Sequence, residues 1–266
     1  MILVSPAHTA FVSFGWRQAL QERAVMLVQL VTYTLLIAIF ASVFLITPFH
    51  ELPTSMVLNA TIMIWYIIVT EVITFAGGGQ NFHEIRGEIL GGQFSASLQR
   101  PKSYFRMKIW TWVGANMIRA SVFLAGGFAL GLLFTHGIPY SGIQFLMLLL
   151  SVYIATLIYT VVYFMLALIE VWGPYARPAM WISQKCAFLF GGLILPLQLY
   201  PHWMQTLAHF TPYPAMLNIP GKIAFDPSFT SMATGIGIQV LWLIITIVVA
   251  IGVQYLAYRH ILKRGY

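Results

Sequence analysis

The sequence predicts an all-α integral membrane protein with six transmembrane helices in one domain over residues 1–266. Of the residues, 59% are hydrophobic and only 8% are charged, and the mean hydropathy is +0.82. Because soluble domains carry about 25% charged residues, most of this surface must face lipid. Six windows are continuously apolar over the length that a helix needs to cross a bilayer, and they lack the alternation of β-strands.

Each predicted span is bounded by residues that end helices or by charge. The spans cover residues 24–47, 55–76, 109–135, 143–169, 182–199 and 232–257. Pro48 follows the first span, and the run of glycines 77–79 follows the second. The fifth span is the least regular, because Gly191, Gly192 and Pro196 interrupt it.

The distribution of positive charge predicts the orientation. With the N-terminus in the cytoplasm, twelve of the fourteen Lys and Arg residues lie on the cytoplasmic side. Arg119 lies within a span, and only Lys222 lies outside. Both termini are therefore predicted to be cytoplasmic. The net charge of +7 reflects this topology and gives no indication of nucleic-acid binding.

Three connecting segments carry further patterns. Residues 10–23 mix aromatic and charged side chains, which predicts an amphipathic helix in the cytoplasmic interface. Residues 77–108 predict two short amphipathic helices with a break near Gly91 and Gly92, the second ending at Pro101. Residues 200–231 contain five prolines and predict short external helices that suit an interface.

No catalytic machinery is predicted in this chain. The single Gly-Lys pair, Gly221-Lys222, lacks the remainder of a phosphate-binding loop. Cys186 is the one cysteine, and most of the seven carboxylates flank spans. We therefore expect no catalytic residue, metal site or bound cofactor in this chain.

Two carboxylates near span ends need partners, because an unpaired charge within a bilayer costs about 2.5–3.5 kcal/mol. Glu71 and Arg119 are placed at similar depth on consecutive antiparallel spans, which predicts an intramembrane ion pair. A carboxylate that contacts the substrate is the alternative for Glu71. Glu170, at the inner end of the fourth span, is expected to meet Arg177 or Lys185.

Two stretches resemble a known family of transporters. Residues 92–104, with Leu98, Arg100-Pro101 and Tyr104, resemble the Gly-x-Leu/Ile…Leu-x-Arg-Pro…Tyr segment of type-2 ABC exporter (ABC-2 family) permeases. Residues 191–203 are similar to that family's Gly…Pro…Tyr/Phe-Pro-x-Trp segment, and Pro212-Tyr213-Pro214 to its next turn. The variety that the chain resembles is the bacterial six-span permease, often encoded as a pair beside one ATPase.

The resemblance implies a coupling helix between spans two and three, which docks onto an ATPase dimer that binds ATP and Mg. The residues carried over to this contact are Glu84, Arg86, Glu88, Gln93, Phe94, Arg100 and Pro101. Gly87-Glu88-Ile89 offers a second alignment, displaced by about five positions. External re-entrant helices are implied between spans five and six, at Gly192, Pro196, Pro201, Trp203, Pro212 and Pro214.

Taken together, these features predict a permease subunit of an ATP-driven exporter in the bacterial cytoplasmic membrane. A second permease, identical or paralogous, and membrane lipid are the other implied partners. Aromatic and aliphatic residues dominate the spans, which favours an amphipathic or lipid-like cargo, a drug or a peptide. The alternatives are a secondary transporter and a membrane assembly or scaffold protein. A secondary transporter would typically show an internal repeat, and none is visible.

Overall fold

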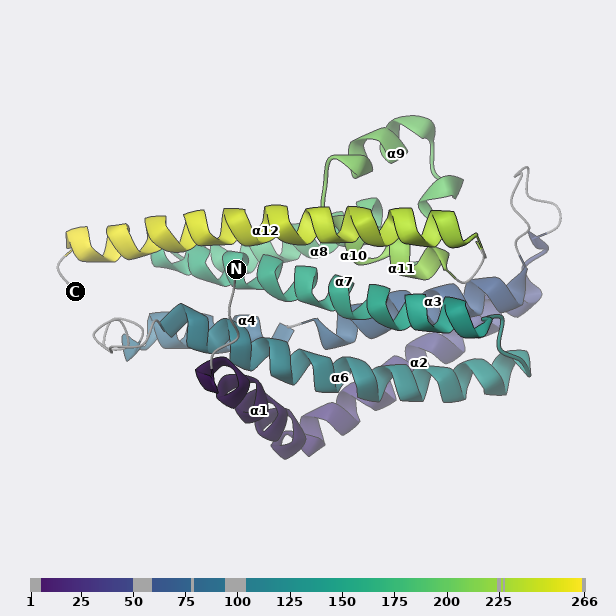
Figure 1. Ribbon diagram of the computed structural model, residues 1–266, viewed down its shortest axis with the longest axis horizontal. Helices are drawn as coiled ribbons and strands as arrows, with labels where there is room; N and C mark the ends of the chain where they lie inside the picture. Colours follow the sequence, from purple (N-terminus) through teal and green to yellow (C-terminus); the bar gives the residue numbers. More distant parts are fainter. Residues whose placement is uncertain are drawn as a thin grey trace.

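The computed structural model describes residues 6–49, 59–77, 79–93, 104–223, 226 and 228–264, and these residues form helices with no strand among them (Figure 1). The elements are α1 (Pro6–Gln21), α2 (Arg23–Ile46), α3 (Ala60–Ala76), α4 (Gly79–Leu90), α6 (Tyr104–Thr135), α7 (Gly142–Leu168), η2 (Ile169–Val171), α8 (Ala176–Phe190), η3 (Leu197–Leu199), α9 (His202–His209), α10 (Tyr213–Met216), α11 (Asn218–Lys222) and α12 (Phe229–Arg264).

Four helices are long and apolar enough to cross a membrane: α2, α6, α7 and α12. They coincide with four of the predicted spans; α6, α7 and α12 lie along the long dimension of the molecule, and α2 crosses it obliquely (Figure 1). Large apolar side chains are exposed on α2 and α12, for example Ile39 at 63% and Val248 at 62%. Such surfaces suit lipid contact, and the chain therefore has the architecture of a multi-pass α-helical membrane protein.

The two remaining predicted spans are shorter. Helix α3 has 17 residues, or about 25 Å at 1.5 Å per residue, against about 30 Å of hydrocarbon. The fifth predicted span, 182–199, is wrong in its bounds, because α8 has 15 residues and ends at Phe190. Gly192 follows in the left-handed region at φ +65°, where the chain turns. Six full spans therefore stay a prediction.

Helix α3 is the centre of the bundle. It packs against α2, α6, α7 and α11, and residues 63–73 are all buried. Trp65, Tyr66 and Ile67 have no exposed surface. An apolar helix that is buried all round belongs inside a bundle and not at its lipid boundary.

Helix α1 lies directly on α6 and begins before the predicted amphipathic segment 10–23. Two glycines allow the close approach. A Cβ atom on Gly15 would lie 2.0 Å from the Thr111 carbonyl oxygen, and one on Gly114 would lie 2.3 Å from the Val12 carbonyl oxygen. Apolar residues such as Phe14 and Trp16 remain exposed on the other face of α1. The helix is thus amphipathic, and one face of it is packed on the bundle.

Candidate functional site

Helix α4 covers the first part of the segment that was predicted to couple to an ATPase, and it begins three residues after the end of α3. Phe82 and Ile85 are fully buried, and Ile89 packs against the same core. Their spacing places them on one face of a helix, and this face lies on α7 and η2. The break expected near Gly91 is present, since α4 ends at Leu90 and Gly92 has a φ of +72°.

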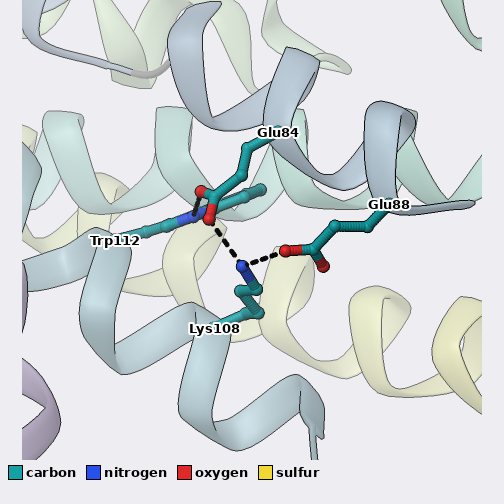
Figure 2. A network of polar contacts seen from close by, with 4 residues as sticks. All are labelled: Glu84, Glu88, Lys108 and Trp112. Carbon is teal, nitrogen blue, oxygen red and sulfur yellow. Dashed lines mark hydrogen bonds and ion pairs between the residues drawn. The ribbon is translucent and has the colours of Figure 1, made fainter. Parts of the chain in front are cut away.

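A cation on α6 holds the other side of α4 (Figure 2). The Lys108 ammonium donates hydrogen bonds to Glu84 Oε1 at 2.5 Å and to Glu88 Oε1 at 2.6 Å. The Trp112 indole N–H donates to Glu84 Oε2 at 3.0 Å. Glu84 and Glu88 lie one turn apart on α4, as Lys108 and Trp112 do on α6, so two short stretches of helix form the whole cluster.

A second ion pair connects α4 to the inner end of α7. Arg86 Nη2 lies 3.3 Å from Glu170 Oε1, and the Glu170 side chain is 1% exposed. Glu170 Oε2 also accepts a hydrogen bond from the Ala176 N–H, at the first residue of α8. A carboxylate at that position stabilises the start of the helix. The expectation that Glu170 meets Arg177 or Lys185 is therefore wrong, because α4 brings Arg86 to it instead.

One stripe of α4 remains exposed to its surroundings. His83, Gly87, Leu90 and Gly91 are exposed and follow helical spacing, and Leu90 is 60% exposed. A Cβ atom added to Gly87 would find no atom within 4 Å. This exposed stripe is a surface of α4 that makes no packing contact with the described part of the bundle. Sequence reasoning missed this stripe, although the sequence shows that positions 83, 87 and 91 fall on the helix face opposite the apolar positions 82, 85 and 89.

The carried-over coupling residues therefore separate into three groups. Glu84, Arg86 and Glu88 make contacts within the chain that hold α4 in place. Gln93 is exposed just beyond the end of α4. Phe94, Arg100 and Pro101 lie outside the described residues.

The predicted ion pair between Glu71 and Arg119 is wrong. Among the described residues the carboxylate that pairs with Arg119 is Glu22, at 2.7 Å from Nη2, while Glu71 has no ion pair and is 4% exposed. Arg119 Nη1 also donates to Asn116 Oδ1 at 3.1 Å, and Asn116 donates to the Gly77 carbonyl at 3.4 Å.

The error has a clear geometric cause. Asn116 is level with Gly77, and because α3 and α6 are antiparallel, Arg119 and Glu71 lie about 4.5 Å and about 9 Å from that level toward the same end of the bundle. Their depths therefore differ by only about 4.5 Å, and the direction of the Arg119 side chain decides its partner. The guanidinium extends toward the α4 end of the bundle and meets Glu22, which lies between α1 and α2. Sequence reasoning treated α1 as a separate interfacial helix and therefore did not consider its carboxylate.

The segment after α8 is fastened to α3. The Tyr66 hydroxyl donates to the Gly192 carbonyl, and the Thr70 hydroxyl donates to the Leu193 carbonyl at 2.7 Å. A Cβ atom on Gly192 would lie 2.9 Å from the Leu195 carbonyl oxygen, so the turn requires glycine. Asn218 on α11 accepts a hydrogen bond from the Leu197 N–H at 3.0 Å, which joins this turn to the short helices.

The residues predicted for the external region lie at the ends of these short helices. Pro196 precedes η3, Pro201 caps α9, and Pro212 caps α10. Pro214 lies in the first turn of α10 and is buried, whereas Trp203 on α9 is 60% exposed. Helix α9 projects from the side of the bundle beyond α12 (Figure 1). The structure therefore contains the predicted short helices; whether they re-enter a membrane stays a prediction.

Asp226 stands near the start of α12, outside the long helices. Burial alone would raise its pKa, but hydrogen bonds from Ser231 and Ser228 and the ion pair with Lys222 at 3.2 Å outweigh this and lower the pKa of Asp226. Among the described residues, no group of three or more His, Cys, Asp or Glu side chains gathers to hold a metal.

Comparison with known proteins gives no family for this chain. No protein-family model matches it, and no curated protein matches its sequence.

Proposed function

We propose that this chain is the transmembrane permease subunit of an ATP-driven ABC exporter and that α4 is the helix that couples it to a separate ATPase. The observation that carries the proposal is the arrangement of α4. Two carboxylates bind Lys108 on one side, Arg86 binds Glu170 on another, and apolar residues face the core. The exposed stripe of His83, Gly87, Leu90 and Gly91 is left facing away from the bundle.

This arrangement suits the transmission of force. A helix that hung loosely between α3 and α6 would absorb the movement of a partner. Helix α4 instead contacts α7 and η2, and its ion pairs reach α6 and the residue that caps α8. A displacement of α4 would therefore be passed to three helices of the bundle, two of which have membrane-spanning length.

The energy source must be a second protein. The sequence lacks a phosphate-binding loop, so the proposed ATPase dimer supplies the ATP and Mg sites and docks on α4. A second permease, identical or paralogous, completes the assembly. The proposed location is the bacterial cytoplasmic membrane, with both termini and α4 on the cytoplasmic side because Lys and Arg gather there.

The six-span topology belongs to the same proposal. Helices α3 and α8 are about 25 Å and 22 Å long, which is short for an independent crossing. The turn after α8 and the short helices α9 to α11 occupy the remaining depth on the outer side. Backbone outside helices is tolerated at membrane depth where protein covers it, and the bonds from Tyr66 and Thr70 cover this turn. The proposed cargo is amphipathic or lipid-like.

The test uses Gly87, where a side chain has space in the isolated chain. The tagged chain is purified from membranes of its own host, and co-purified proteins and ATP hydrolysis are measured. Gly87→Trp should keep the expression level but reduce the recovery of an ATPase about 30-fold, if docking loses about 2 kcal/mol. Gly142→Trp is the matched control, since Gly142 is equally open and lies at the opposite end of α7.

The outcomes separate the proposed function from its alternatives. A secondary transporter or a scaffold protein would recover no ATPase with the wild-type chain. Equal recovery with Gly87→Trp and the wild type would show that an ATPase binds elsewhere, and the role of α4 would be wrong.

A further inference from the structure

An apolar groove of about 390 Å³ runs along the side of the bundle where α6, α7 and α12 meet. On α6 it extends from Arg106 to Met117, and on the antiparallel α12 from Gln254 to Leu243. Each stretch rises by about 16 Å, which is roughly half the thickness of the hydrocarbon layer. The groove therefore has about the length of one leaflet, and it lies at the same end of the bundle as α4.

The chemistry of the groove changes at its mouth. Among the described residues that line it, Arg106 is the only charged one, and Gln254 is the only other polar side chain. Arg106 is exposed and forms no ion pair with the described residues, whereas Lys108, two residues further, is bound by two carboxylates. Trp110 lies one turn along α6 from Arg106, and indole side chains favour membrane interfaces.

We propose that this groove is a binding site for an anionic phospholipid of the leaflet on the α4 side. One acyl chain lies between α6 and α12, and the phosphate is bound by the Arg106 guanidinium, with Gln254 able to donate a hydrogen bond. The proposal does not depend on the exporter function. It rests on a groove that is apolar along its length, with one exposed cation at its headgroup end.

Three observations favour lipid over a protein partner. The groove is continuous with an exposed apolar surface of α12, where Ile251 is 61% exposed and Leu241 is 56% exposed. Its one charge, Arg106, lies at one end of the groove and not among the apolar contacts, as the headgroup of a lipid would require. Guanidinium groups bind phosphate through paired hydrogen bonds, and cationic pockets between membrane helices on this side typically select anionic lipid.

Lipid retention tests the site in the full chain. The purified protein is stripped with detergent, and equal amounts of dioleoyl phosphatidylglycerol and dioleoyl phosphatidylcholine are added. Bound lipid is counted after washing by native mass spectrometry. The wild type should retain phosphatidylglycerol preferentially, and Arg106→Gln should reduce this retention about fivefold, the factor expected for one cation close to an anionic lipid. Ala250→Phe, which fills the groove, should reduce the retention of both lipids.

Two matched variants control for general effects. Arg259→Gln removes another exposed cation near the end of α12, and Val248→Phe enlarges an exposed α12 residue outside the groove. Both should retain lipid as the wild type does. Equal retention of the two lipids by the wild type would overturn the proposal. Lipid retention that neither Arg106→Gln nor Ala250→Phe alters would also overturn it. A change of oligomeric state in Ala250→Phe without loss of lipid would overturn it as well, because this result would indicate that a second copy of the chain occupies the groove.

Discussion

Replacing Lys108 with Met should release α4 from α6. The Lys108 ammonium lies between the carboxylates of Glu84 and Glu88 at 2.5 and 2.6 Å, and the Lys108 side chain is 11% exposed. Methionine keeps much of the side-chain volume but removes the charge. The variant would leave two carboxylates one turn apart with no cation between them.

The free energy by which Lys108→Met destabilises α4 lies between two limits. Exposed ion pairs contribute about 0–1 kcal/mol, and removing one partner of a fully buried pair costs about 3–5 kcal/mol. The Glu84 and Glu88 side chains are 33% and 21% exposed, so water screens them in part. Repulsion between like charges one turn apart adds about 0.2–0.5 kcal/mol. We expect α4 to be destabilised by about 2 kcal/mol.

Hydrogen exchange of the α4 amides is the direct assay. Under conditions where local opening is a rapid equilibrium that precedes exchange, about 2 kcal/mol corresponds to about 30-fold faster exchange in α4. The amides of α7 and α12 should change little. Lys263→Met is the matched control, since Lys263 is an exposed lysine at the end of α12.

Charge removal on α4 tests the cause. Adding Glu84→Gln and Glu88→Gln to Lys108→Met should restore part of the protection, because the uncompensated carboxylates are then gone. If Lys108→Met leaves α4 exchange at the wild-type rate, or the triple variant is less protected than Lys108→Met alone, the ion pairs do not hold this helix.

Three further predictions follow from other contacts. Arg119→Leu should lower the thermal stability by the equivalent of about 2 kcal/mol. Adding Glu22→Gln to this variant should restore part of the stability, whereas adding Glu71→Gln should not. If Glu71→Gln restores stability and Glu22→Gln does not, the observed pairing is wrong. Gly114→Ala should destabilise the protein by about 1–3 kcal/mol in thermal unfolding, because the added methyl group would clash with the Val12 carbonyl. Gly252→Ala is the control and should be neutral or stabilising, because the space around Gly252 is open. Equal effects of the two substitutions would refute the close contact of α1 with α6. Because the pKa of Asp226 is lowered in the folded chain, the stabilising contribution of this carboxylate is present above the unfolded pKa of about 3.9 and is lost as the pH falls through the folded pKa. The thermal stability of Asp226→Asn should therefore decline less steeply below about pH 4 than that of the wild type. An identical decline in the two proteins would contradict the assignment.

The apolar windows were sufficient to predict where the long helices lie. Hydropathy and helix-ending residues placed α2 and α7 to within one residue at each end, because a membrane-spanning helix must be apolar over its whole length. Helix α12 continues seven residues beyond its predicted span, to Arg264. The end of α8 was missed because residues 191–199 are as apolar as a helix, but Gly192 turns the chain and Tyr66 and Thr70 bind its carbonyl groups. These bonds join residues more than 120 positions apart, and hydropathy carries no information about them.

The position of helix α4 was predicted, but the contacts that hold it were not. The mixture of charge and apolar spacing placed an amphipathic helix after residue 77, and α4 is there. The sequence could not show that Glu84, Arg86 and Glu88 bind within the chain, because their partners Lys108 and Glu170 come from other helices. The predicted contact set combined charged residues with Gln93, Phe94 and Pro101, whereas the exposed stripe consists of glycine, histidine and leucine.

Site-specific photo-crosslinking from α4 tests the proposed coupling most directly. A photoreactive amino acid replaces Leu90, which is 60% exposed on the exposed stripe, and in a parallel variant replaces Ile138, which is 51% exposed between α6 and α7. After irradiation of membranes from the native host, adducts of the tagged chain are identified by mass spectrometry. The coupling account predicts an adduct with a protein that contains a phosphate-binding loop from position 90 and none from position 138. Lipid adducts alone from position 90, or the same ATPase adduct from both positions, would contradict it.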